Sequence, residues 1–299
     1  MAAGYMADPV TELLASTPYR PIGLLGRGGM GEVHVIEHEF LGRKFALKVL
    51  RARFADNLQV ADRMRIEAQA AAKLNHPNIV QVVDFWIAAD GRPCMVMELL
   101  EGRTVAAELV ARRQIPLPEA IHITRQLLSA LAVAHDLGVI HRDIKPENLF
   151  LHQPGDHPRI LKVLDFGIAR VVQTTTQSAI QPLNVPTTTG TFLGSPKYAS
   201  PETLCGERVD HRADLYSVGL VLYTLLTGRG AYDRMGAHDD RSTYEVEPPS
   251  RFMGSVARPE LDATVLRAIQ GNISKRYQNA HDFAANLSQL SEGNDAKHS

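Results

Sequence analysis

The chain has few cysteines, no long apolar run and no excess of charge of one sign. Among its 299 residues there are two cysteines, Cys94 and Cys205, so a disulfide-stabilised fold is excluded and a reducing, cytoplasmic location is expected. The longest apolar run, at 215–226, is shorter than the about 20 residues that span a bilayer. The formal net charge of −1 provides no general attraction to nucleic acid or to an anionic membrane.

Two further absences concern targeting and metal binding. Residues 1–18 contain no basic stretch followed by an apolar core, so no signal peptide is predicted, and membrane tethering is expected only if the chain belongs to a longer protein. The 12 histidines show no HExxH spacing, and neither cysteine has a Cys or His at zinc-finger spacing, so a zinc site is not expected. The composition, 44% apolar and 22% charged, is that of a globular protein.

The first informative segment is a glycine-rich string, GRGGMGEV at 26–33, between two apolar runs at 22–25 and 33–36. This pattern predicts a strand, a tight loop and a second strand. Neither a GK[ST] ending nor a helical pattern follows, which disfavours a P-loop or a dinucleotide-binding turn, because both place a helix N-terminus at the phosphate. A glycine-rich loop between strands can bring its backbone close to phosphate groups, although an ordinary hairpin turn also fits this segment alone.

A lysine and a glutamate follow this loop in two different periodic patterns. Phe45–Leu50 alternates as a strand and places Lys48 on the same face as two apolar residues, so its ammonium group is expected to be partly buried and to need an anionic partner. Residues 56–74 contain no Gly or Pro and place Glu67 on the apolar stripe of a helix. The patterns therefore predict an ion pair between Lys48 and Glu67; the alternative is a solvated Glu67 at the edge of the stripe.

Two strings further along the chain complete the set. HRDIKPEN at 141–148 holds an Asp and an Asn five positions apart, and DFG at 165–167 begins with a second Asp. In order with the glycine-rich loop, the lysine and the glutamate, these strings resemble the eukaryotic-type protein kinases. Met30 at the loop tip and the string at 74–80 are most similar to the bacterial members, the eukaryotic-like (Hanks-type) Ser/Thr kinases.

The resemblance implies a two-lobed α+β fold. The small lobe would be an antiparallel sheet with one main helix, and the large lobe would be mainly helical. Residues 1–18 are expected to form a flexible extension and 19–290 the kinase domain, with lobes at about 19–99 and 100–290 and a polar tail at 291–299.

The same resemblance implies roles around the nucleotide. ATP would be the phosphoryl donor, with Asn148 and Asp165 binding Mg²⁺, or Mn²⁺ in its place. Asp143 would accept or orient the proton of the acceptor hydroxyl, and Lys145 would reach the transferred phosphoryl group. The residues expected to contact ATP, or to support that contact, are Leu25, Gly26, Gly28, Gly31, Val33, Ala46, Lys48, Glu67, Met97, Glu98 and Leu100.

The segment from Asp165 to Glu202 matches the activation segment of these kinases and ends in GSPKYASPE. The resemblance implies that Glu202 pairs with Arg276. It also implies that Asp214, near the start of a long apolar helix that ends at Gly228, supports the catalytic loop. An acidic residue at a helix start can in addition cap backbone N–H groups.

Threonines in this segment are candidates for regulation. In kinases with an Arg before the catalytic Asp, here Arg142, that Arg receives a phosphate from the activation segment, which can order a polar loop. Thr187 and Thr189 are the expected phosphorylation sites, and self-association would allow modification in trans. The alternative is a solvated loop whose threonines have no role.

Three departures from the family pattern fall late in the chain. AY at 231–232 replaces an expected PF, 233–247 is polar for a helix of this lobe, and 272–275 lacks the usual DP before the Arg. These departures put substrate docking and the packing of the late helices in question, but not the active site.

The sequence thus predicts a protein Ser/Thr kinase that transfers the γ-phosphoryl group of Mg-ATP to Ser or Thr hydroxyls, because Lys145 is typical of Ser/Thr rather than Tyr kinases. Its partners would be ATP and protein substrates, with no nucleic acid and no membrane segment in this chain. One alternative is a pseudokinase scaffold, which the intact motif residues disfavour. The other is a small-molecule kinase of related fold, which the SPE string and its partner Arg276 disfavour.

Overall fold

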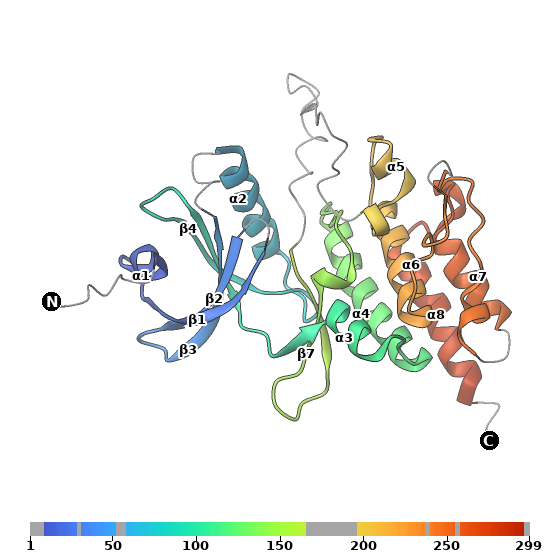
Figure 1. Ribbon diagram of the computed structural model, residues 1–299, viewed down its shortest axis with the longest axis horizontal. Coiled ribbons are helices and arrows are strands. Elements are labelled where there is room, and N and C mark those ends of the chain that lie inside the picture. Colours follow the sequence, from blue (N-terminus) through green and yellow to red (C-terminus); the bar gives the residue numbers. More distant parts are fainter. Residues whose placement is uncertain are drawn as a thin grey trace. The chain divides into compact units, whose positions relative to one another are not determined.

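The computed structural model describes residues 9–28, 31–51, 58–165, 196–236, 240–254 and 258–295 (Figure 1). The chain divides into two compact units, Met1–Asn75 with Val80–Glu101 and His76–Ile79 with Gly102–Ser299. We call them the small unit and the large unit. The main change from one to the other lies between residues 101 and 102, close to the lobe boundary expected between 99 and 100.

The small unit is built on an antiparallel five-stranded sheet with the strand order β1-β2-β3-β5-β4. Its elements are α1 (Pro9–Leu14), β1 (Tyr19–Arg27), β2 (Gly31–His38), β3 (Arg43–Leu50), α2 (Leu58–Lys73), β4 (Val82–Ile87) and β5 (Pro93–Glu98). The strands β1 and β2 flank the glycine-rich segment, as the sequence predicts. This sheet with α2 is the architecture expected for the small lobe.

From Phe45 to Leu50 the strand β3 is buried on both faces, apart from the half-buried Lys48, whereas Arg43 and Lys44 at its start are exposed. Phe45, Leu47 and Val49 lie on one face and belong to a buried apolar cluster of the small unit. On the other face Ala46 is buried and Lys48 is half-buried. The environment of Lys48 is therefore the one that the alternation predicts.

The helix α1 lies within the segment that the sequence predicts to be a flexible extension. Three of its side chains are buried in the cluster that includes Phe45: Val10, Leu13 and Leu14. Tyr19, which follows α1, stacks on Trp86 with 6.1 Å between ring centroids and 7° between ring planes. The expected flexibility therefore does not extend to Pro9–Leu14, and a six-residue helix is too short to show a clear period in the sequence.

The helix α2 agrees with the predicted helix at 56–74. Met64, Ala71 and Leu74, which the periodicity places on one stripe, are all buried. Glu67 belongs to α2, but its side chain lies outside what the structure describes.

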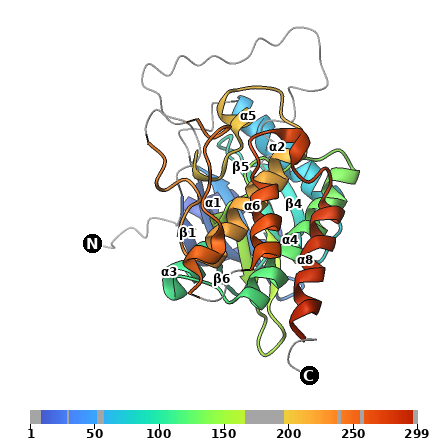
Figure 2. The ribbon, with the colours of Figure 1, turned by 90° about the vertical axis from the view of Figure 1, so that its right-hand side faces the viewer.

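The large unit is mainly helical, as predicted, and Figure 2 shows α4, α6 and α8 packed beside one another. Its elements are β6 (Gly102–Thr104), α3 (Val105–Arg112), α4 (Leu117–Asp136), η2 (Pro146–Asn148), β7 (Leu149–His152), β8 (Ile160–Val163), η4 (Pro196–Tyr198), α5 (Pro201–Leu204), α6 (Arg212–Thr227), η5 (Pro249–Phe252), α7 (Pro259–Ala268), η6 (Ile273–Lys275) and α8 (Ala280–Asp295). The strands β6, β7 and β8 form a small antiparallel sheet.

The two central helices of this unit begin and end close to where the sequence places them. α4 covers the predicted range 118–137 to within one residue at each end, and Gly138 follows it with a φ of 73°. α6 is buried around its whole circumference, which agrees with its apolar sequence. It ends at Gly228, whose left-handed backbone (φ 69°) is readily adopted by glycine.

Between α6 and η5 the described residues 228–236 and 240–248 form turns, bends and irregular segments rather than a helix. This agrees with the polar composition noted for 233–247. Within the described ranges, no helix has the length and hydropathy needed to cross a membrane.

Candidate active site

The loop at 141–148, which the sequence predicts to be the catalytic loop, brings together three of the predicted site residues. The Oδ2 atom of Asp143 accepts hydrogen bonds from Lys145 Nζ at 2.7 Å and from Asn148 Nδ2 at 2.8 Å. The same Nδ2 donates to the backbone oxygen of Asp143 at 2.8 Å, because the short helix η2 turns the chain back on itself. The Asp143 side chain is 44% exposed and can receive a group from outside, whereas Asn148 is buried.

A buried histidine ties this loop to the segment after β8. The backbone N–H of Asp143 donates to His141 Nδ1 at 3.2 Å, so Nε2 carries the proton and donates to the Leu164 oxygen at 2.9 Å. The N–H of Leu164 in turn donates to the Asn148 oxygen at 2.8 Å. Asp165 is the next residue, so the structure places its backbone beside the catalytic loop.

The carboxylate of Asp214 braces the loop from α6. Its Oδ1 accepts the N–H of Arg142 at 2.7 Å, and its Oδ2 accepts the N–H of His141 and Nε2 of His135, both at 2.8 Å. Burial alone would raise the pKa of Asp214, but these hydrogen bonds and the nearby imidazoles hold that pKa below its usual value. The expected capping role is not the one observed, because both oxygens serve the loop and His135, and the N-cap residue His211 makes no side-chain cap.

Backbone strain is concentrated in the same place. In the described part of the chain, Arg113, Arg142 and Asp165 are the non-glycine residues with positive φ, and the last two belong to this site, with φ of 63° and 46°. Such conformations are unfavourable for residues with a Cβ and persist where surrounding contacts hold them. For Arg142, that contact is its bond to Asp214.

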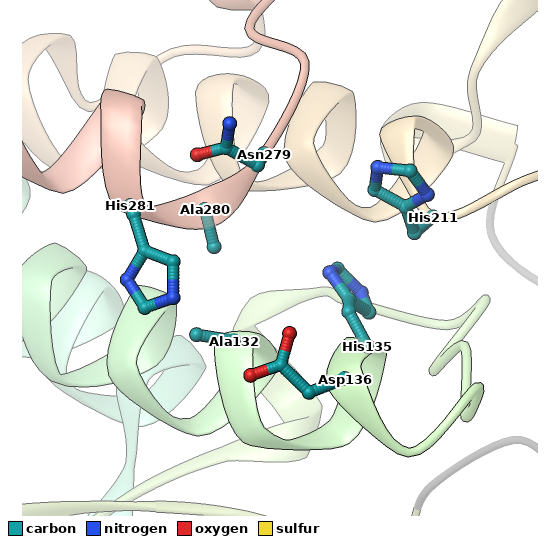
Figure 3. Close-up of a pocket in the computed structure, with 7 residues that line it drawn as sticks. All are labelled: Ala132, His135, Asp136, His211, Asn279, Ala280 and His281. Atoms are coloured by element: carbon teal, nitrogen blue, oxygen red, sulfur yellow. The ribbon is translucent and has the colours of Figure 1, made fainter.

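His135 also lines a pocket between α4, α8 and the start of α6 (Figure 3). In the figure its ring points toward His211, with 5.3 Å between the ring centroids, while His281 lies across from α4 on α8. The Nδ1 atom of His135 is buried, with no hydrogen-bond partner in the part of the chain that the structure describes. Asp143, Lys145 and Asn148 do not line this pocket, which touches the predicted site only through His135, the partner of Asp214.

Asn148 and Asp165 fit a hard divalent cation. The two bonds from Asn148 Nδ2 to Asp143 fix the orientation of the amide, so its Oδ1 faces away from Asp143. Asp165 supplies a half-buried carboxylate one residue after Leu164, which is bonded to Asn148. Amide and carboxylate oxygens are the ligands that Mg²⁺ accepts in proteins.

The end of the activation segment is anchored by a buried ion pair. Arg276 Nη1 and Nη2 donate to the two oxygens of Glu202 at 2.7 and 2.9 Å, and its Nε and Nη2 donate to the oxygens of Gln270 and Gly271 at 2.6 and 3.0 Å. Burial would raise the pKa of Glu202, but the bonds from Arg276 lower it below the usual value. The structure thus brings these two predicted residues together.

In the small unit, the glycine-rich segment is closed by a hydrogen bond from Gly28 N to Gly31 O at 2.8 Å. A Cβ at Gly31 would lie 2.2 Å from the backbone oxygen of Val49, so the close approach of β3 requires glycine there. Gly26 pairs with Val33 beside a register shift after Leu24. The chain can therefore reverse tightly at this point.

The predicted nucleotide-binding residues of the sheet lie in register. Val33 on β2 pairs with Lys48 on β3, and Ala46 pairs with Met97 on β5. Ala46 and Met97 are buried, and Leu25 on β1 is 53% exposed.

Two more residues expected at the nucleotide, Glu98 and Leu100, lie at the end of β5 and just after it. Glu98 is bonded twice to Gln81: its N–H donates to the Gln81 oxygen at 3.0 Å, and its Oε1 accepts the Gln81 N–H at 2.9 Å. Leu100 lies two residues further and is half-buried. The predicted sites that fall outside the described residues are the side chain of Glu67 and the threonines Thr187 and Thr189.

Comparison with known proteins decides the family, because residues 19–279 match the family described as the protein kinase domain. The chain belongs to the protein kinase family. Serine/threonine-protein kinase pkn3 of Myxococcus xanthus is 38% identical over 275 residues, covering 90% of this chain and 49% of that protein. Serine/threonine-protein kinase PknB of Mycolicibacterium smegmatis is 40% identical over 278 residues, covering 90% of this chain and 42% of that protein.

Solved structures agree with this assignment. The kinase domain of Mycobacterium tuberculosis PknI matches with a TM-score of 0.68 at 28% identity, covering 91% of this chain and 96% of that one. The two-lobed protein kinase fold predicted from the sequence is therefore confirmed. The chain spans about half, or less, of the length of the curated relatives named above.

Motif reasoning gave no role to three residues that make long-range contacts in the structure. His135, the side-chain partner of Asp214, lies six residues before the catalytic loop, and its neighbours in sequence give no sign of that bond. Tyr232 and Arg241 fall in the departures from the family pattern. Tyr232 bonds Tyr216 on α6, and Arg241 bonds the backbone oxygen of Ala199 near the end of the activation segment. Periodicity along the chain could not find them, because each pairs with residues far away in the sequence.

Proposed function

We propose that this chain is the catalytic domain of a protein serine/threonine kinase that transfers the γ-phosphoryl group of Mg-ATP to Ser or Thr hydroxyls. The observation that carries the proposal is the cluster in which Lys145 and Asn148 both bond the exposed carboxylate of Asp143. Membership of the protein kinase family, and relatives named as serine/threonine-protein kinases, support it further.

In the proposed reaction, the acceptor hydroxyl oxygen forms a bond to the γ-phosphorus while the bond from that phosphorus to the bridging oxygen of ADP breaks. Asp143 would hold the hydroxyl in line and accept its proton. Lys145, whose ammonium lies 2.7 Å from that carboxylate, would neutralise negative charge on the transferred group. The loop would contribute mainly by positioning the reacting groups. The bonds from Asp214 to the backbone N–H groups of His141 and Arg142 would support this role by fixing the loop.

Asn148 and Asp165 would hold Mg²⁺, or Mn²⁺ in its place. When bound, the cation would neutralise charge on the phosphates during transfer. In the small unit, Lys48 and the glycine-rich backbone around Gly28 would bind phosphate oxygens, and Ala46 and Met97 would contribute apolar surface for the adenine.

We also propose that phosphothreonine in the activation segment regulates the enzyme. Arg142, held by Asp214 in a left-handed conformation, would receive the phosphate of Thr187 or Thr189. Self-association would let one copy modify another. Phosphate mapping of active protein should find at least one of the two threonines modified, and the double change to alanine should lower activity; full activity of that variant with neither site modified in the wild type would rule the mechanism out.

The direct test of the function is transfer from labelled ATP to a generic protein acceptor such as casein, followed by phosphoamino-acid analysis. Label in phosphoserine and phosphothreonine, with dependence on Mg²⁺ or Mn²⁺, is expected. Phosphotyrosine as the main product would refute the acceptor assignment, and no transfer under any condition would favour a scaffold.

A further inference from the structure

The polar segment that replaces a helix after α6 forms a ladder of ring and charge contacts. The hydroxyl groups of Tyr232 and Tyr216 lie 2.5 Å apart in a hydrogen bond. The guanidinium of Arg276, which pairs with Glu202, lies 4.6 Å from the ring centroid of Tyr216. Tyr232 is one of the departures from the family pattern, and here its hydroxyl gives it a partner that phenylalanine could not supply.

Arg241 is the last residue in this chain of contacts, after Arg276, Tyr216 and Tyr232. Its guanidinium lies 4.5 Å from the ring centroid of Tyr232, and its Nη1 donates to the backbone oxygen of Ala199 at 2.8 Å. Its Nε is buried and has no hydrogen-bond partner among the described residues. The guanidinium of the half-buried Arg241, packed on a ring and bonded to a carbonyl oxygen, restrains the backbone at Ala199.

The segment that carries Arg241 is itself held in place. Asp240 accepts the N–H of Ser242 at 2.8 Å on its side chain and the N–H of Tyr244 at 2.8 Å on its backbone oxygen, which closes a turn around Arg241. The turn packs so closely on the loop after α7 that a Cβ at Gly271 would lie 2.1 Å from the Ser242 oxygen. The position of Arg241 therefore does not depend on its own side-chain contacts alone.

Ala199 belongs to a stretch that lies close to the catalytic loop. The preceding residue, Tyr198, is bonded through its backbone oxygen to Ser217 Oγ at 2.8 Å, on the same end of α6 that carries Asp214. Burial raises the pKa of Tyr198 to about 12, and the charge of Glu147 in the catalytic loop contributes to that increase. This stretch is therefore close enough to the loop to contact an acceptor chain that presents its hydroxyl group to Asp143.

We propose that Arg241 is a positioning residue for the protein acceptor: by fixing the backbone at Ala199, it shapes the surface on which the acceptor chain lies next to the catalytic loop. This inference rests on the proposed kinase function. The segment at 240–244, which is not helical, would thus support the surface that contacts the acceptor chain.

The test compares Arg241→Gln and Arg241→Lys with the wild type, with casein as the acceptor. Loss of a hydrogen bond from a charged group changes an equilibrium constant by about a factor of 10 or more. Arg241→Gln should therefore raise the KM for casein about 10-fold. The KM for ATP should change less than twofold. Arg241→Lys keeps a charged donor but loses the planar stack on Tyr232, so it should recover part of the loss.

Arg251→Gln is the matched control, because Arg251 is an exposed arginine that pairs with Glu247 in the same region and should leave both KM values unchanged. Hydrogen exchange in the Arg241→Gln variant of the whole 299-residue chain should be faster in residues 197–205 and unchanged in 141–149. An unchanged KM for casein, an equal rise in both KM values, or unaltered exchange at 197–205 would overturn the inference. Absence of transfer by the wild type would instead contradict the proposed function.

Discussion

Replacing Asp214 with asparagine removes the charge that braces the catalytic loop while keeping the shape of the side chain. The carboxylate accepts three hydrogen bonds of 2.7–2.8 Å, from Arg142, His141 and His135. An amide has a single oxygen, so in either orientation its NH₂ group faces at least one backbone N–H of the loop. Losing one or two bonds to a charged acceptor should cost roughly 2–4 kcal/mol of unfolding free energy.

This loss should appear in both stability and turnover. With about 2–4 °C of Tm for each kcal/mol in a domain of this size, the variant should melt roughly 5–15 °C below the wild type. Displacement of Asp143 by the relaxed loop should lower kcat about 10- to 100-fold with little change in the KM for ATP. Thermal unfolding followed by circular dichroism, and a coupled ADP-release assay, measure the two effects.

The stability difference should also depend on pH. The pKa of Asp214 is lowered in the folded state, so its contribution is present above the unfolded value of about 3.9 and is lost as the pH falls through the lower folded value. The difference in unfolding free energy between the wild type and Asp214→Asn should therefore become smaller in strong acid. The control is Asp210→Asn, four residues earlier, because the partly exposed Asp210 bonds the side chain and the N–H of Arg212 rather than the N–H groups of the loop. If Asp214→Asn were as stable and as active as Asp210→Asn, the bracing argument would fail.

Further predictions concern packing away from the loop. Arg276→Met leaves Glu202 buried without its cation and should lower the unfolding free energy by about 3–5 kcal/mol in urea titrations; a loss below about 1 kcal/mol would show that the pair contributes little. Leu13→Ala should lower the unfolding free energy by about 2–5 kcal/mol, because α1 is part of the core. An unchanged unfolding free energy would show that α1 does not contribute to the stability of the small unit. Gly271→Ala places a Cβ against the Ser242 oxygen and should cost about 1–3 kcal/mol by calorimetry; an unchanged Tm would mean that the turn moves freely.

Much of the fold follows from local patterns. The alternation at Phe45–Leu50 predicts β3, and the half-buried setting of Lys48 follows from the same pattern. Glycine just after the last apolar turn locates the end of α6 at Gly228. These features could be predicted because each depends on residues that are near one another in the sequence.

The parts that could not be predicted depend on distant partners or on short segments. The bond between His135 and Asp214 spans 79 positions, and that between Arg241 and Ala199 spans 42. Neither pair leaves a periodic signal, because each side chain is selected by the tertiary position of its partner. The polar composition of 233–247 marked this segment as a departure from the family pattern, but it could not show that Arg241 contacts Tyr232 and Ala199.

The central claim is that Asp143 handles the acceptor hydroxyl group while other residues hold the nucleotide, and Asp143→Asn tests this most directly. In this variant, the rate of labelled transfer to casein and the affinity for Mg-ATP should respond differently when both are measured. The account predicts transfer lower by on the order of 10²-fold or more, the usual contribution of a positioned acid–base group, with nucleotide affinity roughly intact. Transfer at the wild-type rate would contradict it.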